Sequence, residues 1–256
     1  MALATIDNRR IYYETHGRGD TIVLLHQGFA CSRMWEYIYP DLVDQGYRVV
    51  MYDRRGFGRS EHGPGFNEFY VSDGYRSESV NELAALKDFL GLDSFHIISQ
   101  CEGGVIGLDY AVKHPGQVKT IVTASTPCYT EVTMTKFNRE NFPPFKELDP
   151  ELQAKIISWH GKERSEHLFN LIRLGGGAYG QGVFDLRETL PLVTCPALVL
   201  YPDRSALVGI EQGVVFYRLL PEGELAVFPK CGHNSYDIYP KQYIRFILEF
   251  LKRSDY

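Results

Sequence analysis

Residues 97–104 read "IISQCEGG", and they contain the strongest local signal in this chain. An apolar run with strand character, "SFHIIS" (94–99), precedes Cys101, and "EGGVIGLDYAVKHPG" after it has the pattern of a helix. Ser99 and Gly103 are small, as a sharp strand-to-helix turn requires where two backbones approach closely. The stretch predicts a nucleophile elbow, with the thiol at a helix N-terminus where the dipole lowers its pKa. The alternative, a buried structural cysteine, stays open at this point.

Short apolar runs alternate with amphipathic segments along the rest of the chain. A helix is predicted over 79–92, with Leu83, Leu86 and Leu90 on one face and Gly91 as its stop signal. Such alternation indicates βαβ units and a mostly parallel sheet. The predicted strands are 21–26, 47–53, 94–99, 118–124, 197–202 and 224–229.

The alternation breaks between about residues 130 and 190. This part is rich in turn residues and then shows two short helical patterns, one begun by Asp149-Pro150 and one ended by Gly175-Gly176-Gly177. It has no strand pattern of its own. We therefore expect an α/β core made of 1–130 and 191–256, with 131–190 inserted as a small helical lid.

The amino-acid composition limits the classes of function that the chain can have. The 256 residues are 44% hydrophobic and carry a net charge of -5 without basic clusters, which gives no indication of nucleic-acid binding. No charged leader with an apolar run and no membrane-length apolar stretch occurs, so we expect a soluble, cytoplasmic protein. The five cysteines have no short pair spacing, which favours free thiols over disulfides or a zinc site. We expect a monomer or homodimer that binds a small-molecule substrate and needs no cofactor.

Three further motifs occur in order with the elbow. They are "IVLLHQGFACSRMW" (22–35), "YDRRGFGRSE" (52–61) and "FPKCGHN" (228–234). Together the four motifs resemble those of the α/β-hydrolase superfamily over nearly all of the chain except the expected lid. This resemblance implies a mostly parallel sheet of eight strands, flanked by helices on both faces, with the elbow cysteine at the carboxyl end of a central strand.

The resemblance also implies roles for individual residues. Cys101 occupies the nucleophile position and His233 the general-base position, so we expect the His233 ring within hydrogen-bonding reach of the Cys101 sulfur. The backbone amide of Glu102 would supply one donor of an oxyanion hole, and an amide at Gly28 or Phe29 the other.

The position of the family's catalytic acid departs from the pattern. In "LVLYPDRSALVGIE" (198–211), Ser205 stands where the aspartate is expected, and Asp203 and Glu131 are alternative acids. Because a thiol loses its proton more easily than a hydroxyl, a Cys-His pair can work with a weaker orienting group, such as a Ser205 hydroxyl that accepts the histidine N–H. The Glu102 carboxylate would raise the thiol pKa unless it turns to solvent.

These residues predict a cysteine-dependent acyl hydrolase or acyltransferase that forms a covalent thioester. The aromatic and apolar side chains of the lid favour a small apolar or aromatic ester, lactone or thioester. Two alternatives stay open: a lyase or cyclase that uses His233 for proton transfer, and a ligand-binding protein without turnover. The expected substrate-binding residues are Gln27, Phe29, Phe137 and Trp159.

Overall fold

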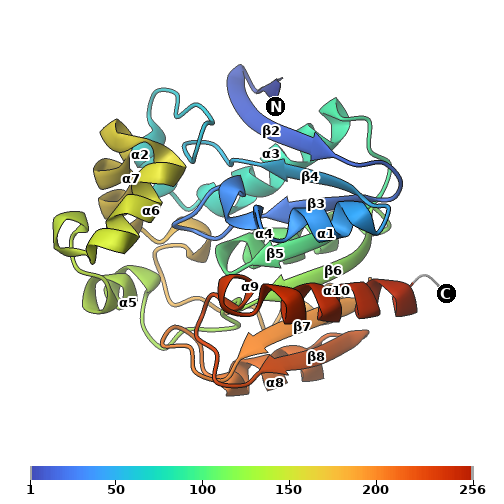
Figure 1. The fold of residues 1–256 in the computed structure, drawn as a ribbon. Helices are drawn as coiled ribbons and strands as arrows, with labels where there is room; N and C mark the ends of the chain where they lie inside the picture. The colour runs from blue at the N-terminus through green and yellow to red at the C-terminus, as the bar shows by residue number, and fades with distance from the viewer. Residues whose placement is uncertain (1, 255–256) are drawn as a thin grey trace.

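The computed structural model describes residues 2–254 and consists of a single eight-stranded sheet with helices on both faces (Figure 1). The strand order is β1-β2-β4-β3-β5-β6-β7-β8, in which β1, β2 and β4 pair antiparallel and every other pairing is parallel. The mostly parallel sheet is therefore confirmed. The strands are β1 (Ala2–Ile6), β2 (Arg9–His16), β3 (Thr21–Leu25), β4 (Arg48–Tyr52), β5 (Phe95–Gln100), β6 (Val118–Ala124), β7 (Ala197–Pro202) and β8 (Gly223–Phe228).

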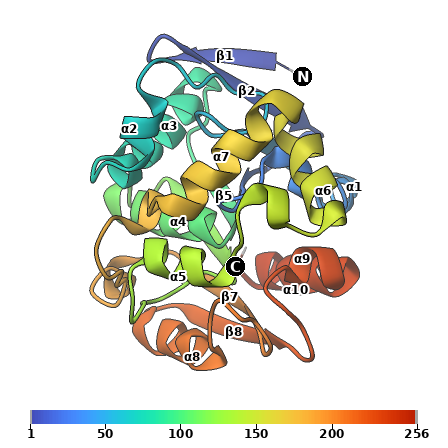
Figure 2. The same cartoon turned by 90° about the vertical axis from the view of Figure 1, so that its left-hand side faces the viewer.

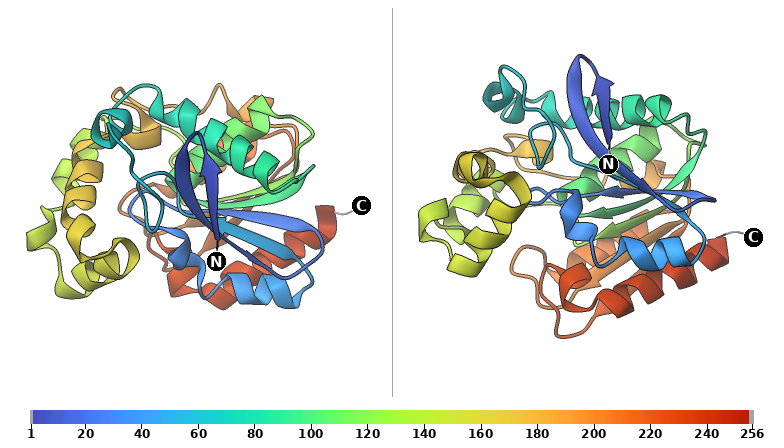
Figure 3. Two further views of the ribbon diagram at one scale, coloured as in Figure 1. Left: turned by 90° about the horizontal axis from the view of Figure 1, so that it is seen from above. Right: turned by 45° about the horizontal axis from the view of Figure 1, so that its top comes forward.

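Two apolar cores lie on opposite faces of the sheet. Along β3, Ile22 and Leu24 belong to one core and Val23 and Leu25 to the other, because successive strand side chains point to opposite faces. Helices α1 and α10 cover the first face, and α3, α4 and α8 cover the second (Figures 1 and 3). The helices are α1 (Tyr39–Asp44), α2 (Phe66–Tyr70), α3 (Tyr75–Phe89), α4 (Glu102–Lys113), α5 (Met134–Asn141), α6 (Pro150–His160), α7 (Lys162–Leu174), α8 (Ile210–Leu219), α9 (Ser235–Ile238) and α10 (Pro240–Ser254).

The six predicted strands are confirmed with shifts of one residue at some ends. Strands β1 and β2, which form a hairpin, are not among the predicted strands, because the β2 sequence "RRIYYETH" does not form an apolar run. The hairpin turn is made by Asp7 and Asn8, both with positive φ (47° and 60°). Helix α3 begins four residues before its predicted start at position 79, and Gly91, with a φ of 62°, follows its end as predicted.

Three α-helices, rather than the predicted two, lie between residues 131 and 190, together with the short 3-10 turns Phe145–Glu147 and Gly177–Tyr179 (Figure 2). The additional helix is α5, which the turn-rich composition of this part concealed. Its N-terminus is capped by Thr133, whose side chain accepts the Lys136 amide, and its Asn138 donates to the carbonyl of Ile172. The predicted ends of the other two are confirmed: Asp149 caps α6, and α7 ends directly before Gly175.

Several side chains fasten helices α6 and α7 to the core, and two of those on the helices bond to backbone groups of core loops. His160 accepts the Gly58 amide on Nδ1 at 2.9 Å, and its Nε2 donates to the Phe29 carbonyl at 3.1 Å. Arg164 donates to the carbonyls of Gly58 and Ser60. The helical segment is thus bonded directly to loops at the carboxyl ends of β3 and β4.

Within residues 2–254, no helix has both the length and the apolar character that crossing a membrane requires. All five cysteines are free thiols, as predicted. Cys31, Cys128 and Cys231 are buried, whereas Cys101 and Cys195 are partly exposed.

The predicted elbow is present between β5 and α4. Cys101 has φ 51° and ψ −117°, a strained conformation typical of residues held at functional sites. Ser99 is accommodated at the tight position and donates to the Val122 carbonyl at 2.8 Å. A Cβ at Gly103 would lie 2.5 Å from the carbonyl oxygen of Leu25 and 2.8 Å from that of His26.

We expect Gly103→Ala to lower the free energy of unfolding by about 1–3 kcal/mol, because the added methyl group forces the β3 backbone away from the elbow. Urea denaturation measures this difference. Gly182→Ala is the control, since a Cβ there meets no atom within 4 Å. Equal stability of the two variants would contradict the close packing of α4 on β3.

Candidate active site

A cavity of about 490 Å³ lies between the carboxyl ends of the central strands and helices α5, α6 and α7. Both the loops at the strand ends and the three helices line it, and most of the apolar side chains come from the helices. It contains most of the predicted site residues: Gln27, Gly28, Phe29, Cys101, Glu102, Phe137, Trp159 and His233. Tyr179 also lines it, and the sequence interpretation gave that residue no catalytic role.

The Cys101 sulfur faces a tyrosine instead of the histidine expected. The Tyr179 hydroxyl oxygen lies 3.1 Å from Sγ. His233 Nε2 is buried and has no hydrogen-bond partner among the described residues, so the expected contact between the ring and the sulfur is not formed. Both groups border the same cavity.

The Cys101 thiol and the His233 imidazole are both neutral at ordinary pH. Burial raises the pKa of the Cys101 thiol to about 11; the Tyr179 hydroxyl opposes this rise and the Glu102 carboxylate adds to it. The predicted lowering of the thiol pKa is therefore wrong, because the loss of hydration outweighs the helix N-terminus. Burial also lowers the pKa of His233 to about 4.

The loop after β8 is tied to the ends of β5 and β6. The His233 carbonyl accepts a hydrogen bond from Gln100 Nε2 at 3.0 Å and from Ser125 Oγ at 2.7 Å. Gln100 directly precedes the elbow cysteine, so the same short segment positions both Cys101 and His233.

Ser205 contacts the imidazole at the position that the sequence indicated. Its Oγ lies 3.3 Å from His233 Nδ1. The same oxygen also accepts the amides of Leu207 at 3.1 Å and Val208 at 3.2 Å. The direction of this contact depends on the tautomer of the imidazole: Ser205 accepts when the ring proton lies on Nδ1 and donates when it lies on Nε2. The expected direction, with Ser205 accepting the histidine N–H, stays a prediction.

The two alternative acids lie elsewhere. Asp203 accepts the Cys231 amide at 3.0 Å and lies 3.6 Å from Arg204. Glu131 is exposed. Among the described residues, no hydrogen bond or ion pair joins either carboxylate to His233.

The Glu102 side chain does not turn to solvent, which the sequence left open. It is 1% exposed, and its Oε2 accepts from Arg54 Nη2 at 2.7 Å. Oε1 accepts the Ala178 amide at 2.8 Å. Arg54 is itself 1% exposed and also donates to the Gln27 carbonyl at 3.3 Å. A buried ion pair thus lies directly beneath the elbow.

The predicted residues that follow β3 line the same cavity as Cys101. Gly28 and Phe29 follow β3 and border the cavity together with Glu102, and their role as oxyanion donors stays a prediction. Phe29 packs against Phe142 and Phe169, with ring centroids 5.1 and 4.9 Å apart. Gln27 donates to the Tyr236 hydroxyl at 3.3 Å, which fixes its side chain at the edge of the cavity.

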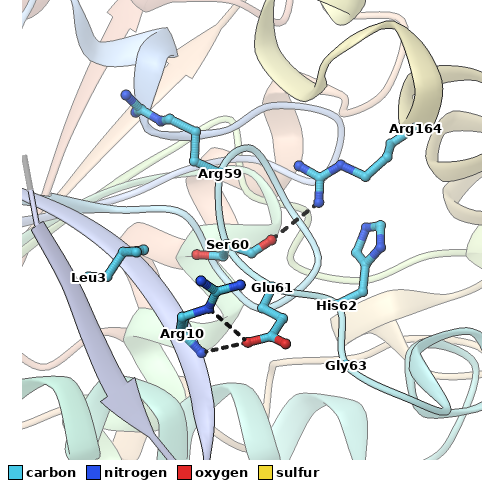
Figure 4. A pocket seen from close by; sticks show the side chains of 8 residues that line it. All are labelled: Leu3, Arg10, Arg59, Ser60, Glu61, His62, Gly63 and Arg164. Carbon is cyan, nitrogen blue, oxygen red and sulfur yellow. Dashed lines mark hydrogen bonds and ion pairs between the residues drawn. The ribbon is translucent and has the colours of Figure 1, made fainter.

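A second hollow, of about 450 Å³, lies beside β2 and residues 59–63 (Figure 4). Arg10 pairs there with Glu61 at 3.5 Å, and Arg164 donates to the Ser60 carbonyl. Among the described residues that line it, none is predicted for catalysis or substrate binding. In residues 2–254, no group of three or more His, Cys, Asp or Glu side chains is placed to hold a metal ion.

Comparison with known proteins connects this geometry to a family. The family described as alpha/beta hydrolase fold matches residues 20–173. A 2-hydroxy-6-oxo-6-phenylhexa-2,4-dienoate hydrolase of Burkholderia cepacia is 24% identical, covering 96% of this chain and 92% of that protein. A 2-hydroxy-6-oxononadienedioate/2-hydroxy-6-oxononatrienedioate hydrolase of Dechloromonas aromatica is 27% identical, covering 94% and 90%.

Solved structures share the fold. An enol-lactonase from Burkholderia xenovorans superposes with a TM-score of 0.77 at 19% identity, covering 98% of this chain and all of that chain. A meta-cleavage product hydrolase from Pseudomonas fluorescens gives a TM-score of 0.81 at 16% identity, covering 99% and 98%.

Proposed function

The chain belongs to the alpha/beta hydrolase fold family, and from this premise we propose that it is a cysteine-dependent hydrolase of small apolar or aromatic acyl compounds. The observation that carries the proposal is the strained elbow, which presents Cys101 to a cavity that His233 also lines. Esters, lactones and thioesters are the substrate classes, with helices α5–α7 acting as a lid. The names of relatives, an enol-lactonase and hydrolases of oxo-dienoates, favour unsaturated carbonyl compounds.

In the acylation step, Sγ of Cys101 attacks the acyl carbon, and the thiol proton passes to His233 Nε2. The carbonyl oxygen becomes an oxyanion held by the backbone amides of Glu102 and of Gly28 or Phe29. Collapse breaks the bond to the leaving oxygen or sulfur, which takes the proton back from His233. Because both groups are neutral at rest, the proton moves during the attack and not before it.

Deacylation repeats these transfers with water. A water molecule attacks the thioester carbon and gives one proton to His233, and the released Cys101 sulfur recovers that proton. An acceptor alcohol or thiol in place of water would make the same site an acyltransferase. In both steps Nε2 has to be unprotonated, which places the imidazole proton on Nδ1.

Intact mass spectrometry with an activated aryl ester tests the proposal. We expect a transient adduct with the mass of the acyl group, which peptide mapping places on Cys101 and which Cys101→Ala does not form. Turnover without any adduct, together with full turnover of Cys101→Ala, would contradict it.

A second candidate function rests on the Ser205 contacts. If the hydroxyl donates to Nδ1, His233 presents an N–H to the cavity and polarises a substrate carbonyl as a neutral electrophile. That role suits a lyase or cyclase in which the thiol is never acylated. The state of the imidazole therefore distinguishes the two functions.

A further inference from the structure

The hydroxyl of Tyr179 contacts the atom that reacts in the proposed function. We propose that Tyr179 is a catalytic residue, which donates a hydrogen bond to Cys101 Sγ while the sulfur carries negative charge, and that Glu102 and Arg54 are its positioning residues. The proposal rests on the proposed function in one respect, namely that the sulfur is the reacting atom. The distance of 3.1 Å between the two atoms is its first support.

The direction of the hydrogen bond follows from the chemistry of the pair. Burial raises the pKa of Tyr179 well above its ordinary value, so its hydroxyl keeps its proton. A thiolate has no proton to donate. When Cys101 ionises or begins its attack, Tyr179 is consequently the donor and the sulfur the acceptor, and a charged acceptor strengthens such a bond.

Glu102 fixes the position of Tyr179 through the backbone of the preceding residue, Ala178. Residues Gly177–Tyr179 form one short helical turn, and the Ala178 amide in its middle donates to Glu102 Oε1 at 2.8 Å. The other carboxylate oxygen is held by Arg54 at 2.7 Å. These contacts connect Glu102, which follows Cys101 in the chain, to Tyr179, whose hydroxyl lies beside the Cys101 sulfur.

The turn Gly177–Tyr179 packs closely against the Glu102 carboxylate, as the surroundings of Gly177 show. Gly177 has a φ of 53°, which favours glycine, and a Cβ there would clash with Glu102 Oε1 and lie 2.7 Å from the Tyr70 hydroxyl. The ring of Tyr179 packs edge-on against Phe184, with centroids 5.0 Å apart. Backbone, carboxylate and ring contacts therefore hold the hydroxyl at the sulfur. The contacts of the Glu102 carboxylate also explain why an acidic residue follows Cys101, since this carboxylate anchors the turn that carries Tyr179.

The rate of Cys101 alkylation by iodoacetamide, measured against pH by peptide mass, tests the catalytic role. Tyr179→Phe is expected to slow alkylation at pH values of about 9 by roughly tenfold and to move the midpoint upward, because the thiolate loses a donor. Tyr243→Phe is the control: it removes a buried hydroxyl that has no partner among the described residues and belongs to the opposite core. Alkylation of Tyr179→Phe at the wild-type rate would overturn the role.

Two substitutions at Glu102 test the positioning role. Glu102→Gln and Glu102→Ala both remove the charge and leave Arg54 unpaired, but only glutamine keeps an oxygen for the Ala178 amide. We expect the alanine variant to be alkylated several-fold more slowly than the glutamine variant; equal rates would overturn the positioning role. Alkylation reports on the sulfur without turnover, so its failure is distinguishable from failure of the acyl-adduct test.

Discussion

Cys101→Ser is expected to lower kcat/KM for an accepted ester by about 10⁴-fold. A serine hydroxyl is much harder to deprotonate than a thiol, and it needs an imidazolium stabilised by a carboxylate in the transition state. In this site the group at His233 Nδ1 is the neutral hydroxyl of Ser205. Steady-state kinetics on an activated aryl ester measure the loss.

Cys101→Ala separates nucleophilic attack from other roles of the sulfur. In the hydrolase mechanism it should be at least as inactive as Cys101→Ser, since it has no nucleophile at all. If both variants keep most of the activity, the thiol is not acylated and the electrophilic role of His233 takes its place.

Ser205→Asp is expected to raise the pKa of His233 from about 4 by roughly one to three units, because an opposite charge then lies beside Nδ1. The carboxylate accepts the Nδ1 proton and leaves Nε2 unprotonated. Nitrogen NMR of the imidazole measures the pKa and also the position of the ring proton, which the general-base role places on Nδ1 in both the wild-type protein and the variant. A wild-type proton on Nε2 would contradict the general-base role of His233 and favour its electrophilic role.

Activity provides the second measurement for this substitution. With Cys101 present, Ser205→Asp should change turnover only modestly, whereas in Cys101→Ser it should recover about 10²-fold, since a hydroxyl nucleophile depends on that charge. Such strong non-additivity is expected of residues that act as one unit. Ser205→Asn is the matched control, because it adds a side chain of similar size without the charge. Equal recovery by Asn and Asp would show that size rather than charge is responsible.

The elbow was predictable because its requirements are local. Small residues at 99 and 103 and a strand followed by a helix specify a turn, whatever the rest of the chain does. The thiol pKa was not predictable in the same way. Tyr179, which lies 78 residues along the chain, packs over the sulfur, and burial by such distant segments dominates the local effect of the helix N-terminus.

The acid position illustrates a second limit. Counting residues along a family pattern placed Ser205 beside the imidazole, and the structure shows that contact. The direction of the hydrogen bond depends on how the chain turns after Ser205, which brings the amides of Leu207 and Val208 onto the same oxygen. The spacing of residues in the sequence predicts which side chains lie next to each other. Which atom of a hydrogen bond carries the proton depends on all the donors and acceptors around it.

The attachment of the helical segment at His160 has a consequence for protein engineering. The ring bridges the Gly58 amide and the Phe29 carbonyl, and Phe29 borders the nucleophile. A chimera that exchanges residues 134–174 for those of a relative therefore changes more than substrate preference. Unless the graft brings a histidine at position 160, it leaves two backbone groups of the recipient without their bonds. A graft without a histidine at position 160 is therefore expected to disturb the segment beside Cys101, even where the graft carries the intended specificity.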